Sequence, residues 1–293
     1  MRSVSPRVIR LTVFAGLCAG VVAAVTAWYW FGAGLGQPVD AHAYWMTRDG
    51  VLYEHLVRLS PDAFLYSPAF AQVIAPITAL DFPNFIAVWR AINLAAFVGL
   101  AGPLSAPLLF WSPVASEVNA GNIHLLFGAA IVIGFRWPAT WALILLTKVT
   151  PGIGLLWFAV RKEWHQLAIV AAVTALIVAI SAILSPHAWL DWLTLLMANS
   201  QSADGPLPIP VPLIVRVPLA AALVIWGART DRPATVPVAA LVALPVIWFH
   251  SLSLLVAVIP LAVWPGARRV GAMGRHRVTS IATQEDGRYT PRP

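Results

Sequence analysis

Long continuous runs of hydrophobic residues follow one another along most of the chain. An α-helix needs about 20 mostly apolar residues to cross a bilayer, and these runs approach that length. They do not alternate apolar with polar residues, as the strands of an outer-membrane barrel do. The pattern predicts an all-α, polytopic membrane protein with eight full spans near residues 9–32, 65–80, 84–102, 119–135, 165–184, 211–228, 233–249 and 250–266.

Two further segments fit no straight transmembrane helix. Residues 137–160 are apolar, but basic residues flank both ends and Pro151 lies near the middle. Two half-length helices that meet at a break would keep both ends on one side, and a broken backbone is tolerated at membrane depth only beside a cavity or within protein. Residues 103–118 contain three prolines and Glu117, which favours a short re-entrant piece. With these irregular elements we expect about 8–10 transmembrane helices.

Composition excludes other classes of protein. Hydrophobic residues make up 59% of the 293 residues and charged residues only 11%, against about 25% charged residues in a typical soluble domain. The single cysteine, Cys18, excludes a disulfide framework and a cysteine-based zinc site. The net charge is +7 and comes from 17 arginines and 2 lysines, a bias that, with abundant alanine and valine, is typical of a GC-rich bacterial genome.

The basic residues predict the orientation. Arginine and lysine in the termini and short loops all fall on one face of the predicted topology, and the positive-inside rule makes that face cytoplasmic. Both termini are then cytoplasmic. The longer hydrophilic loops 33–64 and 185–210 lie on the outer side of the inner membrane. Residues 1–266 form a transmembrane domain, and residues 267–293 form a basic, disordered tail near anionic lipid. A cleaved signal peptide at the first span is an alternative, which the length of its apolar run disfavours.

Polar groups in or beside membrane helices are costly, so each one marks a candidate site. A partly buried carboxylate is a stronger base, lysine and arginine hold phosphate, and histidine can donate a hydrogen bond to a leaving phosphate. This combination suits glycosyl or phosphoryl transfer on a lipid-borne substrate. The predicted outer face gathers Asp40, Tyr66, Glu117, Asn119, Asn122, His124, Lys148, His187, Asp191, Arg216 and His250.

Simpler interpretations of the same residues stay open. Asp40 fits a solvated loop carboxylate, Lys148 a side chain that snorkels to the interface, and His250 a packed histidine. Arg216 fits an interfacial anchor, and His187 a surface residue. The sequence contains no Walker A, GxSxG or HExxH motif, so nothing predicts nucleotide binding or serine or zinc hydrolysis.

Several short motifs, taken in order, resemble a known family. They are Asp40 followed by Tyr44, YSPAF at 66–70, AGN at 120–122, KVTPG at 148–152, RKEW at 161–164, SPHAWLDWL at 185–193 and WFHSL at 248–252. The chain resembles glycosyltransferase family 87 over about residues 35–265. Members of this family are actinobacterial, polyprenyl-phosphate-mannose-dependent enzymes of GT-C architecture.

The resemblance implies an inverting transfer of a sugar, with mannose expected, from a polyprenyl phosphate to a glycolipid or glycan at the outer membrane face. It implies Asp40 as the base, His250 as a contact of the donor or leaving phosphate, and Lys148 as a phosphate partner. Topology adds Arg216 as a second phosphate ligand. Substrate contacts are expected from Tyr44, Tyr66, Asn122 and His187. No cofactor, metal or nucleic acid is expected; the partners are the donor, the acceptor and membrane lipids.

Some features depart from the family, which usually has a longer C-terminal half and more helices. The first outer loop is compact, and Asn119 stands beside the AGN element, where related sequences often show a glutamine just before the asparagine. An inactive relative, or a lipid-binding or lipid-translocating protein without catalysis, is the alternative hypothesis. A transferase predicts an outward cavity with Asp40 and Lys148 lining one pocket. A translocator predicts a lateral path that reaches both faces, and a structural assembly subunit predicts that the polar groups do not converge.

Overall fold

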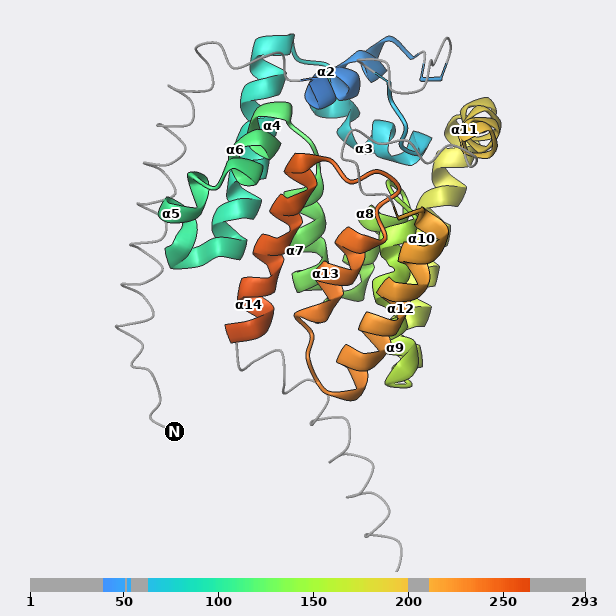
Figure 1. The fold of residues 1–293 in the computed structure, drawn as a ribbon. Coiled ribbons are helices and arrows are strands. Elements are labelled where there is room, and N and C mark those ends of the chain that lie inside the picture. The colour runs from blue at the N-terminus through green and yellow to red at the C-terminus, as the bar shows by residue number, and fades with distance from the viewer. Residues whose placement is uncertain (1–38, 51, 54–62, 200–210, 264–293) are drawn as a thin grey trace, which may run out of the picture.

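A computed structural model of the chain describes residues 39–50, 52–53, 63–199 and 211–263. The predicted first span at 9–32 and the predicted tail at 267–293 lie outside these residues. Within the described residues every regular element is a helix, which confirms the all-α prediction (Figure 1). The helices are α2 (Val39–Met46), α3 (Pro68–Thr78), α4 (Phe82–Ala101), α5 (Ser105–Leu109), α6 (Ser112–Ala120), α7 (His124–Gly134), α8 (Trp141–Leu145), α9 (Leu156–Val160), α10 (Trp164–Leu184), α11 (Pro186–Asn199), α12 (Leu213–Arg229), α13 (Thr235–Val242) and α14 (Val258–Val263). Shorter 3₁₀ segments are η1 (Thr47–Asp49), η2 (Gly102–Leu104), η3 (Pro138–Thr140), η4 (Thr150–Leu155) and η5 (Phe249–Ala257).

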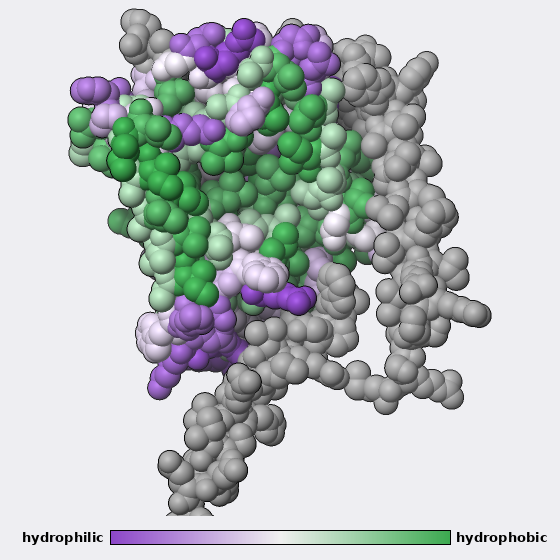
Figure 2. Space-filling view, turned by 180° about the vertical axis from the view of Figure 1, so that it is seen from behind, coloured by the Kyte–Doolittle hydropathy of each residue, from purple (hydrophilic) through white to green (hydrophobic). Residues whose placement is uncertain are grey.

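Two of the described helical stretches are long and apolar enough to cross a membrane. They are Phe82–Leu109, which runs from α4 into α5, and α10. Helix α10 fully buries only Val170 and Ser181, and large apolar side chains such as Leu176, Ile180 and Ile183 are exposed, as expected for a helix that contacts lipid. Figure 2 shows a broad hydrophobic band between hydrophilic surfaces at the two ends of the molecule. The chain is therefore a helical membrane protein.

Other predicted spans are shorter or interrupted. The span expected at 233–249 becomes α13, which ends at Val242 shortly before Pro245, because proline cannot continue a helix. The segment 137–160 is broken as predicted: α8 ends at Leu145, and the helical path resumes at Thr150 in η4 and α9. The expected outer loop at 185–210 is different, because residues 186–199 form the helix α11.

A sharp bend shapes the region that carries most of the polar residues. Helices α6 and α7 meet at 105°, where the sequence predicted a straight span from 119. Gly121 sits at the bend with a φ of +70°, a conformation that glycine adopts at little cost. Its carbonyl accepts a 2.6 Å hydrogen bond from Trp89 Nε1. A Cβ atom at this position would lie 2.6 Å from Ala41 Cβ, so the bend and helix α2 are in close contact.

We expect Gly121→Ala to destabilise the protein by about 2 kcal/mol, from left-handed backbone strain and from overpacking against Ala41. Gly50→Ala is the matched control, because Gly50 has a φ of +79° but a Cβ atom added there would have nothing within 4 Å. Thermal unfolding in detergent should show a larger decrease in Tm for the Gly121 variant. Equal decreases would contradict a close packing of α2 on the bend.

Candidate active site

Four segments that are distant in sequence bring their polar side chains to one end of the molecule. They are the start of α2, the bend between α6 and α7, the break between α8 and η4, and the start of η5 (Figure 1). Helix α2 is held there by an aromatic cluster. Its Tyr44 packs edge-on against Phe70 of α3 and Trp89 of α4, with ring centroids 5.6 and 5.4 Å apart. This packing fixes the position of Asp40, one turn earlier in the same helix.

Asp40, Asn122 and His250 form the more exposed part of the cluster. Asp40 Oδ2 lies 3.7 Å from His250 Nε2, and Asn122 Nδ2 lies 3.3 Å from the same nitrogen. The Trp248 ring stacks on the His250 ring at 6.0 Å and 7°. The Asp40 side chain is one-third exposed, while that of His250 is only 12% exposed. A carboxylate therefore stands at the accessible side of a pre-ordered histidine and amide.

The environment of Asp40 changes its basicity. Asp40 lies in α2, outside the candidate spans, and burial raises its pKa to about 6. A hydrogen bond from Asn122 and the positive charge of Lys148 act in the opposite direction, whereas the charge of Glu117 adds to the increase. Such a carboxylate is largely ionised at neutral pH and is a better proton acceptor than an ordinary aspartate.

A second, more deeply buried part of the cluster centres on His124. Glu117 Oε1 accepts a 2.6 Å hydrogen bond from the His124 backbone N–H, and Glu117 Oε2 lies 3.0 Å from His124 Nδ1. On the other side of the ring, His124 Nε2 lies 3.0 Å from Lys148 Nζ and 3.3 Å from Ser251 Oγ. The His124 and His250 rings are 5.6 Å apart. The two parts of the cluster are therefore in contact.

Aromatic rings border the lysine. Lys148 Nζ lies 5.7 Å from the Tyr66 ring centroid and 5.9 Å from that of Phe127, within the range of cation–π attraction. The Tyr66 and Tyr44 hydroxyls are 3.0 Å apart. One connected set of side chains therefore contains the predicted residues Tyr44, Tyr66 and Lys148 together with Asp40, Asn122 and His250.

Arg216 and His187 are placed differently. The Arg216 guanidinium donates to four backbone carbonyls, those of Val211, Val242, Leu244 and Pro245, at 2.8–3.1 Å. These bonds stabilise the chain after α13, where the helix leaves its carbonyls without partners. His187 is exposed in the first turn of α11. Among the described contacts, none joins either residue to the cluster.

The sequence placed Glu117 and His124 among the polar groups of the outer face but assigned them no specific role, and it did not single out Ser251. Glu117 and His124 are seven residues apart, which on a straight helix would place them on the same face but about 10 Å apart along the axis. The left-handed Gly121 between them ends α6 and turns the chain, so the two side chains meet. The glycine in AGN is the one sequence signal that could have suggested this contact.

Three of these side chains are of the type that binds transition metals. Glu117, His124 and His250 offer ligand atoms within 4.8 Å of one another. However, His124 Nε2 faces the Lys148 ammonium, and His250 Nε2 faces the Asn122 amide. A divalent cation would have to displace both donors and would be repelled by the lysine. The arrangement favours a centre built around Lys148.

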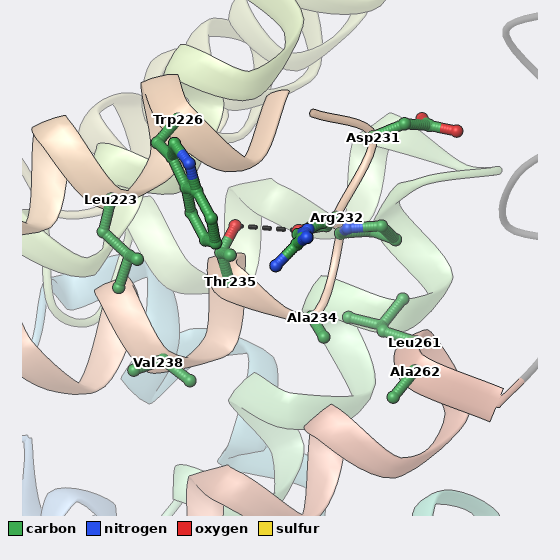
Figure 3. A pocket seen from close by; sticks show the side chains of 10 residues that line it. Leu223, Trp226, Asp231, Arg232, Ala234, Thr235, Val238, Leu261 and Ala262 are labelled. Atoms are coloured by element: carbon green, nitrogen blue, oxygen red, sulfur yellow. Dashed lines mark hydrogen bonds between the residues drawn. The ribbon is translucent and has the colours of Figure 1, made fainter. Parts of the chain in front are cut away.

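A cavity of about 470 Å³ lies at the opposite end of the molecule, between α12, α13 and α14 (Figure 3). The Arg232 guanidinium carbon lies 4.8 Å from the Trp226 ring centroid beside it, and Asp231 pairs with Arg161 at 3.0 Å. This cavity contains none of the predicted site residues and is separate from the cluster.

The fold and the cluster together define a helical membrane protein with a polar, partly buried centre at one end. The Glycosyltransferase family 87 model matches residues 64–282, and the chain belongs to that family. It is therefore a glycosyltransferase. The match includes Tyr66, Asn122, Lys148 and His250, whereas Asp40 and Tyr44 precede it. No curated protein and no solved structure matches the chain.

Proposed function

We propose that the protein transfers a sugar, with mannose expected, from a polyprenyl phosphate to a lipid or glycan acceptor at the outer face of the cytoplasmic membrane. The observation that carries the proposal is the convergence of Asp40, Asn122, Lys148 and His250 at one end of the helices. A base and a phosphate-binding cation are the two functions that displacement from a lipid phosphate requires.

The proposed reaction is a single displacement. Asp40 accepts the proton of the acceptor hydroxyl, and the hydroxyl oxygen forms a bond to the anomeric carbon of the donor. The bond between that carbon and the phosphate oxygen breaks, and polyprenyl phosphate leaves with its electron pair. Lys148 and His250 stabilise the negative charge that develops on the phosphate oxygen. The anomeric configuration inverts, and no covalent enzyme intermediate forms.

The alternative is a lipid-binding or lipid-translocating protein that performs no chemistry. The same lysine would then hold a lipid phosphate, and Asp40 would have no role in proton transfer. The presence of both a carboxylate, Asp40, and a cation, Lys148, in one cluster supports the transferase, because the acceptor hydroxyl and the donor phosphate need different groups. Family membership supports it as well.

The donor class is tested with purified protein in lipid nanodiscs and a lipid extract of the host as acceptor. Radiolabelled polyprenyl-phosphate-mannose should give a labelled lipid product, and radiolabelled nucleotide-mannose should give none. Transfer from the nucleotide sugar alone would overturn the proposed donor. Binding of the lipid donor without any transfer would favour the non-catalytic alternative.

The rate of transfer should depend on pH through Asp40. Because the base must be deprotonated, kcat/KM should fall about tenfold per pH unit below a pKa of about 6, rather than below the usual value near 4. The rate measured between pH 4.5 and 8 with a fixed acceptor concentration tests this expectation. A profile that stays flat down to pH 4.5 would exclude a raised pKa of the base.

A further inference from the structure

Lys148 is held by a buried chain of hydrogen bonds that does not itself reach the accessible side of the site. The chain runs from Glu117 through the His124 ring to the lysine ammonium. The Glu117 and His124 side chains have no solvent exposure. Burial of two polar side chains costs free energy unless they form hydrogen bonds with each other or with a third group.

The bonds on the two sides of the His124 ring fix the same tautomer. A lysine ammonium can only donate hydrogen bonds, so His124 Nε2 must accept from Lys148 Nζ and carries no proton. The proton of the neutral ring is then on Nδ1, where Glu117 Oε2 accepts it. Ser251 Oγ, which also accepts from the Trp248 backbone N–H, lies beside the same Nε2 atom. The ring therefore has one defined orientation and presents a lone pair to the lysine.

This arrangement restrains a flexible side chain. The lysine side chain has four rotatable bonds and loses conformational entropy when a ligand fixes it. The contact with His124 Nε2 uses one of the three ammonium donors, so two remain for another acceptor. The rings of Tyr66 and Phe127 restrict the movement of the ammonium group on two further sides. A lysine held in this way can bind a phosphate with less loss of entropy.

We propose that Glu117 and His124 are positioning residues, which hold the Lys148 ammonium in place for the phosphate of a polyprenyl-phosphate ligand. The inference rests on the proposed function for the identity of that ligand. His124 acts on the lysine directly through Nε2. Glu117 acts through His124 by accepting hydrogen bonds from the ring Nδ1 and from the backbone N–H, which fixes the ring orientation.

Two substitutions of His124 separate this role from simple packing. The amide of glutamine reaches the position of Nε2, and that of asparagine reaches only the position of Nδ1. His124→Gln therefore keeps an acceptor for Lys148, whereas His124→Asn keeps the contact with Glu117 and loses that acceptor. We expect His124→Asn to weaken binding of a short-chain polyprenyl phosphate in detergent about tenfold or more, and His124→Gln to weaken it at most about threefold.

The reference ligand is the corresponding polyprenyl alcohol, which shares the chain and lacks the phosphate. Neither variant should change binding of the alcohol, because the lysine contacts only the phosphate. In the Lys148→Met background, His124→Asn should cause no additional loss, as expected when one residue acts through the other. A purely structural role would weaken both ligands and would add to the Lys148 substitution.

Equal losses for the two His124 variants, equal losses for phosphate and alcohol, or additive losses with Lys148→Met would each overturn the inference. Equal binding of phosphate and alcohol by the unmodified protein would overturn it as well. The binding measurement needs no turnover, so it is independent of the proposed reaction. Sugar transfer with no effect of His124→Asn on phosphate binding would leave the proposed function standing and remove this inference alone.

Discussion

Asp40→Asn is expected to lower kcat for sugar transfer about 10³-fold, because removal of a general base costs 10²- to 10⁴-fold. The amide has the size of the carboxylate and can still face His250, so the donor site should keep its shape. The side chain is one-third exposed, and the variant should remain folded. Initial rates at saturating donor and acceptor measure the effect.

The control for Asp40→Asn is the same change at Asp49, whose side chain in η1 is 61% exposed. Asp49→Asn should transfer sugar at the rate of the unmodified protein. Full activity of Asp40→Asn would exclude Asp40 as the base. Loss of activity in both variants would indicate a general effect of charge at this end of the molecule.

Lys148→Met is expected to lower kcat/KM for the donor about 10²-fold. Methionine keeps the length of the side chain but removes the cation that faces the leaving phosphate, and loss of one such stabilising group costs about 10²- to 10³-fold. His124 Nε2 would also lose its donor, although Ser251 remains beside it. Steady-state kinetics with varied donor and fixed acceptor measure the change.

The chain offers a second lysine as a control, because Lys162 is exposed beyond α9. Lys162→Met makes the same chemical change outside the cluster and should leave the kinetic constants unchanged. A larger effect on the acceptor KM than on the donor kcat/KM would contradict the assignment of Lys148 to the donor phosphate.

The sequence predicted the fold where hydrophobic length decides it. Continuous apolar runs identified α4 and α10 within about two residues, and the flanking basic residues with Pro151 identified the break before η4. The bend at Gly121 and the helix α11 were missed. Hydropathy reports how apolar a segment is and contains little information on where a single glycine turns the chain.

The site was predictable in part. Asp40, Asn122, Lys148 and His250 were identified because each is a polar residue at the end of an apolar run, and the structure brings them together. Arg216 has the same sequence signature but binds backbone carbonyls. A buried arginine that stabilises a chain reversal cannot be distinguished from a ligand-binding arginine without the positions of the carbonyls.

Glu117 and His124 are the opposite case from Arg216, because the structure places them in the cluster although no role was predicted for them. Both were recognised as unusual polar residues, yet their contact depends on the 105° bend between α6 and α7. Their partners Lys148 and Ser251 come from segments further along the chain. Long-range contacts of this kind follow from tertiary packing, which no local pattern in the sequence contains.

The anomeric configuration of the transferred sugar tests the proposed mechanism most directly. The purified protein is incubated with a polyprenyl-phosphate sugar of known configuration, and the isolated product is examined by NMR spectroscopy. A single displacement with Asp40 as base predicts the configuration opposite to that of the donor. Retention of the donor configuration would contradict direct displacement and would require a different role for Asp40.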